Sequence, residues 1–375
     1  MNKVVLLFTN YGPYHVARLK GFHKILTRVD DLEVVGIELS RVESTYEWTT
    51  SINELNTPFH TVVKDKSWEE VSLFNLTKSL YKVLNEVEPD IIVIAGYHLP
   101  IFLMTIVYAK FRNKKLILMM ATKEDDTKRY FLKEKVKSYI IKTYAAAVVG
   151  GSPQRRYLIK LGMPSEKVFS GYNVVDNSSF DRALAIPTQS PLGKPFFLSI
   201  NRFVEKKNLA RLLYCYHTYR KEIGSRAWDL VLIGDGELRP QIENMVISLN
   251  LSGTVHLTGF LQQHDQIPYL HHAKCFIHGS LQEQWGLVVN EAMASSLPSF
   301  VSNRCGCFED LIIEGETGFG FDPESTDELV NLMMRASLNL IDLERIGNNA
   351  YRHIQLFSPE YFGTNLLSAI QSMFI

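Results

Sequence analysis

Residues Phe276–Pro298 read FIHGSLQEQWGLVVNEAMASSLP, and this stretch decides how the rest of the chain is interpreted. A short apolar run is followed by a polar turn and then by a segment with helical character. This order predicts the end of a buried strand, a loop, and a helix from Gly286 to Ser295. The first turn of a helix leaves backbone N–H groups without partners, so an anion such as a phosphate is stabilised there.

Two carboxylates flank the start of this predicted helix. Glu283 lies in the loop and Glu291 lies inside the helix. Ionised carboxylates accept hydrogen bonds and therefore suit neutral polyols. A phosphate and hydroxyls together indicate a nucleotide-sugar as the ligand. The alternative interpretation is a surface loop and an amphipathic helix that carry two solvated glutamates.

The stretch resembles the E-x7-E motif of the retaining glycosyltransferases of family 4, which have the GT-B fold of two Rossmann-like α/β domains facing across a cleft. Glu283 and Glu291 have the required spacing, and the helix reads EAMA before Leu-Pro. The family usually has glycine where this chain has Ser296. The resemblance implies that Glu291 binds the ribose hydroxyls and that Glu283 binds hydroxyls of the donor sugar. It implies N–H contacts to the sugar and the distal phosphate from Gly286, Leu287 and Val288.

Length and composition predict a globular protein of two domains. The chain has 375 residues, of which 46% are hydrophobic, and a formal net charge of zero. At roughly 150 residues per domain, two domains are expected. Because the formal net charge is zero, the sequence gives no reason to expect nucleic acid as a partner. The N-terminal MNKVVLLFTNYG is predicted to be a first strand rather than a signal peptide, and no apolar run reaches the roughly 20 residues of a membrane helix. We therefore expect a cytoplasmic protein, with association at the inner face of the membrane as an alternative.

The cysteines show no disulfide or metal-ligand framework. They occur at positions 215, 275, 305 and 307, and no second Cys or His pair follows Cys305-Gly-Cys307 at ligand spacing. We expect reduced, structural thiols, no metal site and no cofactor.

Strands alternate with helices along the whole chain. Continuous apolar runs at Lys3–Thr9, Ile91–Ala95 and Leu116–Met120 are typical of strands buried on both faces of a parallel sheet. Amphipathic segments at residues 14–29 and 68–88 predict helices between such strands. The alternation predicts an α/β fold with right-handed crossovers.

Two less regular stretches divide this pattern. Residues 41–66 predict a long loop with at most one strand, and residues 173–195, rich in Asn, Ser and Pro, predict a linker. We expect an acceptor-binding domain over residues 1–180 and a nucleotide-sugar-binding domain over 190–358. The GT-B resemblance implies that the helix over 359–375 packs back on the first domain.

A basic turn follows the first strand of the second domain. Arg202 and Lys207 lie in NRFVEKKN, at the carboxyl end of that strand. A planar guanidinium and a compact ammonium together suit a diphosphate. The pair resembles the family's Arg-x4-Lys pair, which neutralises the leaving nucleoside diphosphate without a divalent metal. A solvated basic turn is the alternative, and it would suit Lys206 better.

Two further turns in this domain are weaker candidates. The turn at Gly234 resembles the family's Gly-x-Gly-Pro turn, and it serves either a phosphate or the backbone alone. The resemblance implies nucleobase contacts from the backbone near Phe260 and Leu261, where the alternative is a buried turn.

The first domain offers two histidines near predicted strand ends, where ligands of parallel sheets bind. His98 resembles the family's active-site histidine, which contacts the donor sugar near the reacting carbon. His15 begins a helix after the first strand, and only Gly12 remains of the paired glycines usual in that loop. Tyr11 and Tyr14 are predicted to stack on a sugar ring. The alternative for each histidine is a packing role.

Residues 110–142 contain eleven Lys and Arg but four Asp and Glu, interleaved with aromatic residues. This composition suits either peripheral contact with an anionic membrane or a solvated basic face.

The resemblance predicts a metal-independent hexosyl- or glycosyltransferase. It would move a sugar from a UDP- or GDP-sugar to an acceptor hydroxyl, with retention of the anomeric configuration. The acceptor would be a glycan, a lipid-linked glycan or a small molecule, in polysaccharide, glycolipid or glycoside synthesis.

Three other functions are alternatives. A sugar-nucleotide epimerase on the same fold would need carboxylate and histidine acid/base groups, for which His98 is the candidate. A non-catalytic scaffold would have no reason to keep the four charged residues Arg202, Lys207, Glu283 and Glu291. A dehydrogenase is disfavoured because no Gly-x-Gly-x-x-Gly follows the first strand of either domain.

Overall fold

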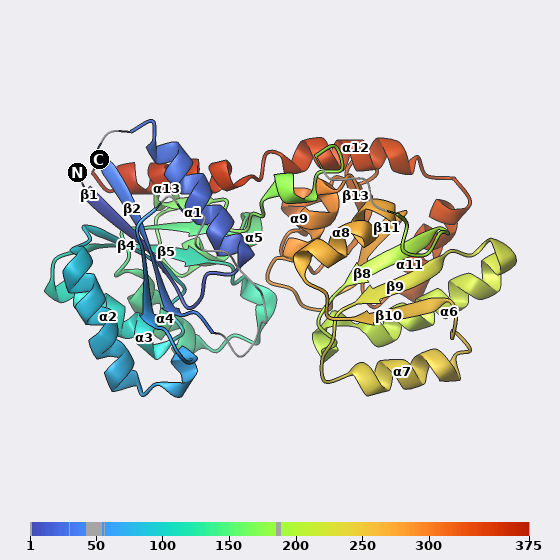
Figure 1. Cartoon of the computed structure of the whole chain (residues 1–375), viewed down its shortest axis with the longest axis horizontal. Helices are drawn as coiled ribbons and strands as arrows, with labels where there is room; N and C mark the ends of the chain where they lie inside the picture. Colours follow the sequence, from blue (N-terminus) through green and yellow to red (C-terminus); the bar gives the residue numbers. More distant parts are fainter. Residues whose placement is uncertain (1, 30, 43–54, 56, 185–188, 375) are drawn as a thin grey trace. The chain divides into compact units, whose positions relative to one another are not determined.

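The chain divides into two compact units (Figure 1). The computed structural model describes residues 2–29, 31–42, 55, 57–184 and 189–374. Unit 1 consists of Met1–Asp176 with Phe357–Ile375, and unit 2 consists of Asn177–Leu356. Each unit is built on one sheet, and all pairings between the named strands are parallel. The prediction of two parallel α/β domains is confirmed.

Unit 1 has a seven-stranded sheet in the order β3-β2-β1-β4-β5-β6-β7. Its strands are Asn2–Phe8 (β1), Leu32–Ser40 (β2), Phe59–Val63 (β3), Ile91–Ala95 (β4), Lys115–Met120 (β5), Ala146–Val149 (β6) and Val168–Ser170 (β7). Its helices are Pro13–Leu26 (α1), Leu73–Val87 (α2), Pro100–Phe111 (α3), Phe131–Ile141 (α4), Ser152–Lys160 (α5) and Pro359–Gln371 (α13). The strand order reverses between β1 and β4, which is the place where ligands bind open parallel sheets.

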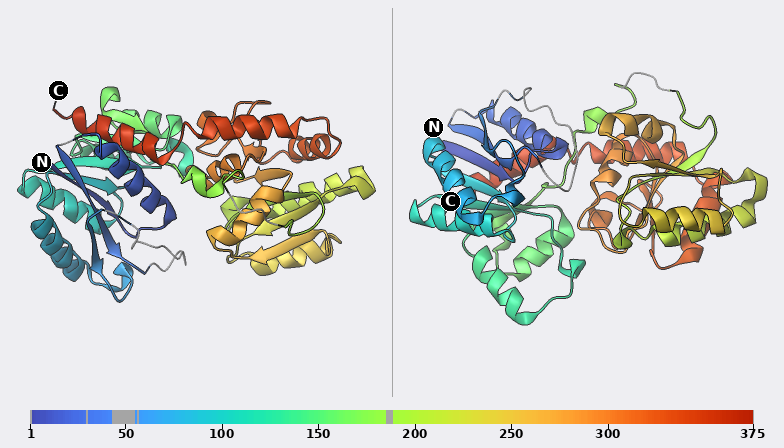
Figure 2. Two further views of the ribbon diagram at one scale, coloured as in Figure 1. Left: turned by 45° about the horizontal axis from the view of Figure 1, so that its top comes forward. Right: turned by 60° about the horizontal axis from the view of Figure 1, so that its bottom comes forward.

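The sheet of unit 1 is covered on both faces. Side chains of α1 and α13, such as Phe22 and Phe362, pack with one face of the strands, while those of α2 and α3, such as Leu80 and Phe102, pack with the other. Figure 2 shows these two helix layers from other directions. Because both faces are covered, the strands read as continuous apolar runs in the sequence.

The C-terminal helix α13 lies directly against α1. A Cβ atom added at Gly21 would lie 2.3 Å from the carbonyl oxygen of Pro359, and one added at Gly363 would lie 2.9 Å from the carbonyl oxygen of Gly21. Lys24 Nζ lies 2.6 Å from Glu360 Oε1 at the same contact. Glycines on both helices therefore permit a backbone approach that any side chain would prevent.

Unit 2 has a six-stranded sheet in the order β10-β9-β8-β11-β12-β13. Its strands are Phe196–Ile200 (β8), Asp229–Ile233 (β9), Val255–Gly259 (β10), Cys275–His278 (β11), Ser299–Ser302 (β12) and Gly318–Phe321 (β13). Its helices are Leu209–Ile223 (α6), Arg239–Ser248 (α7), Gln263–His272 (α8), Leu287–Ala294 (α9), Phe308–Leu311 (α10), Thr326–Ser337 (α11) and Leu343–Ile354 (α12). Here the strand order reverses between β8 and β11.

Some element boundaries differ from the sequence prediction. The single helix expected over 68–88 is a short 3-10 turn at Trp68–Glu70 followed by α2, because Ser72 caps α2 by accepting a hydrogen bond from the Asn75 N–H at 3.4 Å. The strand allowed within 41–66 is β3. Residues 43–54 and 56 of that loop, and 185–188 of the predicted linker, lie outside the described residues.

Replacing Gly21 with alanine should destabilise unit 1, because the new Cβ would force α13 away from α1. Overpacking of this kind costs about 1–3 kcal/mol. Differential scanning calorimetry should therefore show the transition of unit 1 shifted down by about 2–12 °C. Lys20→Ala, at an exposed position of the same helix, is the control and should change stability by less than about 0.5 kcal/mol. An unchanged transition in Gly21→Ala would contradict the close helix contact.

Candidate functional site

The candidate site in unit 2 lies where the strand order of its sheet reverses. Strands β8 and β11 pair in parallel, with Cys275 opposite Phe197 and Phe276 opposite Leu198. The loops that follow these two strands therefore leave the same edge of the sheet side by side. These are the two loops that carry Arg202, Lys207 and Glu283.

The two loops meet in an ion pair between Lys207 Nζ and Glu283 Oε2. The side chains are only 13% and 14% exposed, respectively. The Leu281 N–H also donates to the Lys206 carbonyl oxygen at 2.9 Å, which joins the two backbones. A cation and a carboxylate predicted from separate motifs are thus in direct contact.

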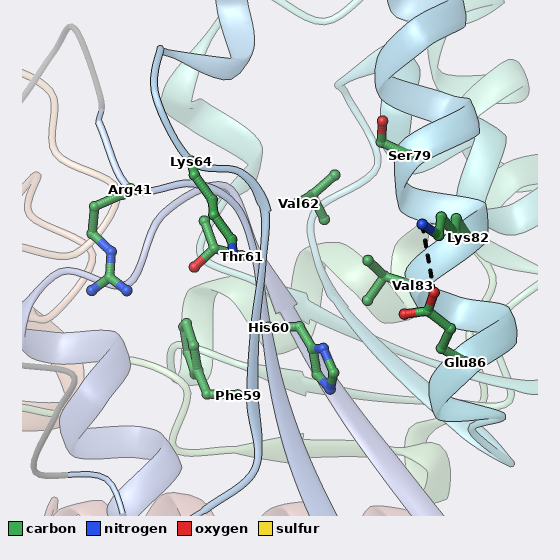
Figure 3. Close-up of a pocket in the computed structure, with 10 residues that line it drawn as sticks. All are labelled: Arg41, Phe59, His60, Thr61, Val62, Lys64, Ser79, Lys82, Val83 and Glu86. Carbon is green, nitrogen blue, oxygen red and sulfur yellow. Dashed lines mark ion pairs between the residues drawn. The ribbon is translucent and has the colours of Figure 1, made fainter.

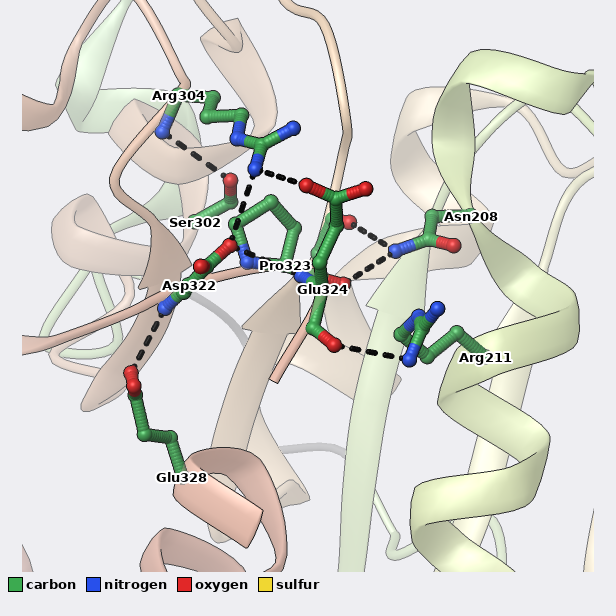
Figure 4. Close-up of polar contacts among 9 residues, drawn as sticks. Asn208, Arg211, Ser302, Arg304, Asp322, Pro323, Glu324 and Glu328 are labelled. Carbon is green, nitrogen blue, oxygen red and sulfur yellow. Dashed lines mark hydrogen bonds and ion pairs between the residues drawn. The ribbon is translucent and has the colours of Figure 1, made fainter. Parts of the chain in front are cut away.

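Asn208 joins the same region to the neighbouring strands. Its side-chain nitrogen donates to the carbonyl oxygens of Gly279 at 3.2 Å and Pro323 at 2.8 Å. Figure 4 shows this bridge beside Arg304, which pairs with Asp322 at 3.2 Å and with Glu324. The loops after β8, β11, β12 and β13 are therefore fixed to one another by polar contacts.

The Glu283 loop is also held by the loop after β12. The Gly306 N–H donates to the Glu283 carbonyl oxygen at 3.0 Å, and the Cys307 N–H donates to the Trp285 carbonyl oxygen at 3.2 Å. All four cysteines are buried free thiols, and burial raises the pKa of Cys307. Within the described ranges no group of three or more His, Cys, Asp or Glu could hold a metal ion. The cysteines beside Glu283 thus contribute packing and backbone contacts.

His278 contacts the carboxylate of Glu283 from the end of strand β11. This histidine was not among the residues predicted from the sequence. It ends β11 and is fully buried, and its Nε2 lies 3.4 Å from Glu283 Oε2 and 3.3 Å from Ser280 Oγ. Burial lowers the pKa of His278, and the charge of Lys207 lowers it further, so the ring is neutral at pH 7. A proton on Nε2 then donates to Glu283, while the buried Nδ1 has no partner among the described residues.

Glu283 is ionised at neutral pH. Burial by itself would raise the pKa of Glu283, but the hydrogen bond from His278 and the charge of Lys207 outweigh it. The pKa of Glu283 therefore lies well below its ordinary value. Both carboxylate oxygens are acceptors in this state.

The loop then enters α9 through Gly286. This residue has φ +105°, and a Cβ there would lie 3.3 Å from His278 Nε2, so glycine suits the position on both counts. Leu287 and Val288 form the first turn of α9, where backbone N–H groups have no acceptor within the helix. The indole of Trp285 donates to the Asn290 side chain at 2.9 Å and holds the loop against the helix.

The other predicted residues of unit 2 are placed as follows. Arg202 is exposed on the loop of Lys207, whereas Glu291 is buried in α9.

The two turns predicted as weaker candidates differ in their surroundings. Gly234 has φ +130°, and a Cβ there would lie 1.8 Å from the Asn201 carbonyl oxygen, so the close approach of the backbone is enough to explain why this residue is glycine. Phe260 is 42% exposed, which rules out the buried-turn interpretation for its ring. Leu261 is half-buried, and its carbonyl oxygen accepts from Gln266 at 2.7 Å.

In unit 1 the candidates follow the two strands at which that sheet reverses. His98 is exposed beyond β4, and Gly96, with φ +102°, makes room for its ring. His15 lies in the first turn of α1, after the N-cap Gly12, and stacks on Phe8 with ring centroids 4.1 Å apart. Burial, followed by the positive charge of Arg18, lowers the pKa of His15 to about 3, so this imidazole is neutral.

The prediction that Tyr11 stacks on a sugar is wrong. Its ring is fully buried, and its hydroxyl donates to the Leu6 carbonyl oxygen at 2.8 Å. Its backbone N–H donates to the buried carboxylate of Glu38 at 3.1 Å, which fixes the turn before α1. Tyr11 is therefore part of the core.

A separate cavity of about 690 Å³ lies between the edge strand β3 and α2. Figure 3 shows its lining, which includes the cations Arg41, Lys64 and Lys82. It contains none of the predicted site residues, and β3 is two strands away from the reversal at β1 and β4. We assign it no part in the site.

The chain resembles known proteins in sequence and in fold. Residues 182–353 match the family model described as glycosyl transferases group 1. The matched residues make up most of unit 2. A solved structure of Anabaena Alr3699/HepE in complex with UDP and glucose superposes with a TM-score of 0.75 and 16% identity, covering 99% of this chain and 100% of that one. This likeness extends over both units and confirms the GT-B fold.

Curated relatives match over shorter stretches. An uncharacterized glycosyltransferase of Methanocaldococcus jannaschii is 25% identical over 255 residues, which are 62% of this chain and 60% of that protein. The alpha-1,3/1,6-mannosyltransferase ALG2 of Mus musculus is 31% identical over 169 residues, 41% of this chain and 40% of that protein. The chain thus spans about two fifths to three fifths of the length of these relatives.

The depressed pKa of Glu283 predicts a pH-dependent contribution to stability. A carboxylate of this kind stabilises the fold above its unfolded pKa of about 4.3, and the contribution is lost as the pH falls further toward the folded value. The difference in unfolding free energy between wild type and Glu283→Gln should therefore be largest near pH 7 and shrink below about pH 4.3. Chemical denaturation at several pH values measures it. Glu344→Gln, at an exposed position of α12, is the control. A difference that stays constant from pH 7 to pH 3 would contradict the contacts of Glu283.

Proposed function

We propose that the chain is a retaining glycosyltransferase that moves a sugar from a nucleoside-diphosphate sugar to an acceptor hydroxyl. The observation that carries this proposal is the contact of Lys207 with Glu283 beside the start of α9. It combines a cation, an ionised carboxylate and free helix N–H groups at the edge where ligands bind such sheets. A charged diphosphate and a neutral sugar need this combination.

The donor is assigned to unit 2. Lys207 and Arg202 neutralise the diphosphate, and the N–H groups of Gly286, Leu287 and Val288 contact the distal phosphate and the sugar. Glu283 binds sugar hydroxyls. Glu291 binds the ribose, while the backbone of Phe260 and Leu261 contacts the base. The complex of Alr3699/HepE with UDP and glucose, which shares this fold, supports a nucleoside-diphosphate sugar, either a UDP-sugar or a GDP-sugar, as the donor.

Lys207 can bind the carboxylate of Glu283 and a phosphate of the donor at the same time. An ammonium group has three hydrogens, so Lys207 can keep its bond to Glu283 while it donates to a phosphate oxygen. The pair then links the sugar end of the donor to the phosphate end. This linkage explains why two residues from different loops are held together before any donor is bound.

In the proposed reaction the acceptor oxygen forms a bond to the anomeric carbon as the bond from that carbon to the diphosphate oxygen breaks. The acceptor proton passes to the departing diphosphate oxygen on the same face of the sugar. Lys207 and Arg202 stabilise the negative charge that develops there, without a metal ion. Proton NMR of the product should show the anomeric configuration of the donor.

The acceptor is assigned to unit 1, together with His98 and the turn from Gly12 to His15. These residues follow β4 and β1, at which the sheet of unit 1 reverses. We propose a hydroxyl of a glycan, a lipid-linked glycan or a small molecule as acceptor, and a cytoplasmic site of action. No described helix is long and apolar enough to cross a membrane.

The epimerase alternative finds no support in the described part of unit 2. Its acid/base groups must touch the substrate, whereas His278, the histidine next to Glu283, is fully buried. A neutral, enclosed imidazole orients Glu283 but cannot exchange a proton with a bound sugar.

Glu291→Ala should weaken donor binding at least tenfold, because the lost acceptor leaves ribose hydroxyls unpaired, at about 1–3 kcal/mol. Thermal shift with UDP, GDP, ADP and their sugars identifies the base, since a ligand at a hundred times its Kd stabilises by about 2.7 kcal/mol. Isothermal titration of the best ligand then gives the affinities of wild type, Glu291→Ala and the control Glu344→Ala. Wild-type affinity in Glu291→Ala would refute the ribose assignment, and no shift with any nucleotide would favour a scaffold.

A further inference from the structure

Helix α4 has its polar and apolar sides reversed relative to an ordinary surface helix. Four apolar side chains point away from the protein: Phe131 is 72% exposed, Leu132 75%, Val136 59% and Tyr139 72%. The side that faces the protein carries Glu134, Lys137 and Ser138, with Ile141 buried and Ile140 partly buried against the core. A surface helix of a globular protein normally turns its apolar stripe toward the core.

Specific contacts hold α4 in this orientation. Lys137 Nζ lies 2.7 Å from Glu134 Oε1, and the Tyr157 hydroxyl on α5 donates to Glu134 Oε2 at 2.7 Å. Lys137 Nζ also donates to the Tyr157 hydroxyl at 3.1 Å, and Tyr157 is buried. Turning the apolar side inward would break all three contacts and place both charges in water. The exposure of the apolar side is therefore built into the fold of unit 1.

Lysines surround the exposed apolar side. The ammonium of Lys135 lies 4.5 Å from the centre of the Phe131 ring, and that of Lys133 lies 5.2 Å from the centre of the Tyr130 ring. Lys128 and Lys142 lie 5.9 Å from the rings of Tyr130 and Tyr139. All four lysines are exposed.

The acidic groups near α4 lie beside cations. Glu124 pairs with Lys160 and Glu134 pairs with Lys137, while Asp125 and the buried Asp126 share Lys123 at 2.6 and 3.7 Å. The surface formed by α4 is therefore apolar at its centre and positively charged around it.

We propose that the outer face of α4, formed by Phe131, Leu132, Val136 and Tyr139 with the lysines at 128, 133, 135 and 142, docks on an anionic lipid bilayer. An 11-residue helix is about 16 Å long, too short to cross a bilayer, so α4 lies in the plane of the headgroups. The apolar side chains enter the boundary with the acyl chains, while the lysines contact lipid phosphates. An anionic bilayer fits both parts of this surface. Its acyl chains match the apolar side chains, and its negative charge complements the surrounding lysines.

The inference does not depend on the proposed transferase activity. It does restrict the acceptor, because a transferase held at a bilayer by its acceptor-binding unit is suited to an acceptor embedded in that bilayer.

Co-sedimentation with vesicles tests the proposal on the full chain. Vesicles of phosphatidylcholine alone are compared with vesicles that contain phosphatidylglycerol as well. Wild type should bind the anionic vesicles at least tenfold more tightly than the neutral ones, and 0.5 M NaCl should reverse most of this preference. Equal binding to both kinds of vesicle, or binding to neither, would overturn the proposal.

Two variants separate the apolar and charged contributions. The double substitution Leu132→Ser with Val136→Ser should weaken binding to anionic vesicles at least tenfold, and Lys133→Gln with Lys135→Gln should remove most of the preference for anionic lipid. The matched controls are Leu340→Ser and Lys221→Gln, exposed positions of unit 2 that should bind like wild type.

Nucleotide thermal shifts check folding and distinguish this proposal from the proposed function. Variants of α4 that keep a nucleotide response but lose vesicle binding support the membrane face. Variants that bind vesicles like wild type would overturn it, whatever their nucleotide response. A dimer in gel filtration that Leu132→Ser with Val136→Ser dissociates, without vesicle binding, would make α4 a protein interface and would also overturn it.

Discussion

The parallel pairing of β8 with β11 is the constraint on which the site of unit 2 depends. At this pairing the strand order reverses, so the chain leaves both strands at one edge and the two loops must share the same space. A buried side-chain bond reinforces the pairing, because the Ser199 hydroxyl donates to the Ile277 carbonyl oxygen at 2.7 Å, and Asn201 donates to Ser199 at 2.8 Å. Lys207 and Glu283 can meet only because these two strands are neighbours.

The ion pair contributes to position as well as to stability. Removing both charges from water carries a desolvation penalty, so the pair adds less to stability than the attraction between the charges alone would give. His278 lowers this penalty by donating to Glu283 from a fully buried position, and the loop after β12 holds the Glu283 backbone in place. Unit 1 holds a similar polar contact, in which Glu134 and Lys137 contact Tyr157 while the apolar side chains of α4 point outward.

Much of this arrangement could be predicted from the sequence, and the misses have physical reasons. Apolar runs between helical segments predicted two parallel α/β domains, and motif spacing singled out Lys207 and Glu283. His278 was missed because a lone histidine at the end of an apolar run looks like any core residue until its neighbours are known. Tyr11 was misjudged because a tyrosine in a turn gives no sign of whether its hydroxyl faces water or, as here, a strand carbonyl. The basic and aromatic composition of residues 110–142 was evident, but the outward direction of α4 depends on its contact with Tyr157.

The most direct test of the account is a crystal structure of the chain with bound UDP or, if the thermal shifts favour it, GDP. We expect the diphosphate at the carboxyl ends of β8 and β11, within hydrogen-bonding distance of Lys207 Nζ and the first N–H groups of α9, with Glu283 still in contact with Lys207. A nucleotide bound in the cavity beside β3, or at any place that leaves Lys207 and Glu283 untouched, would contradict it.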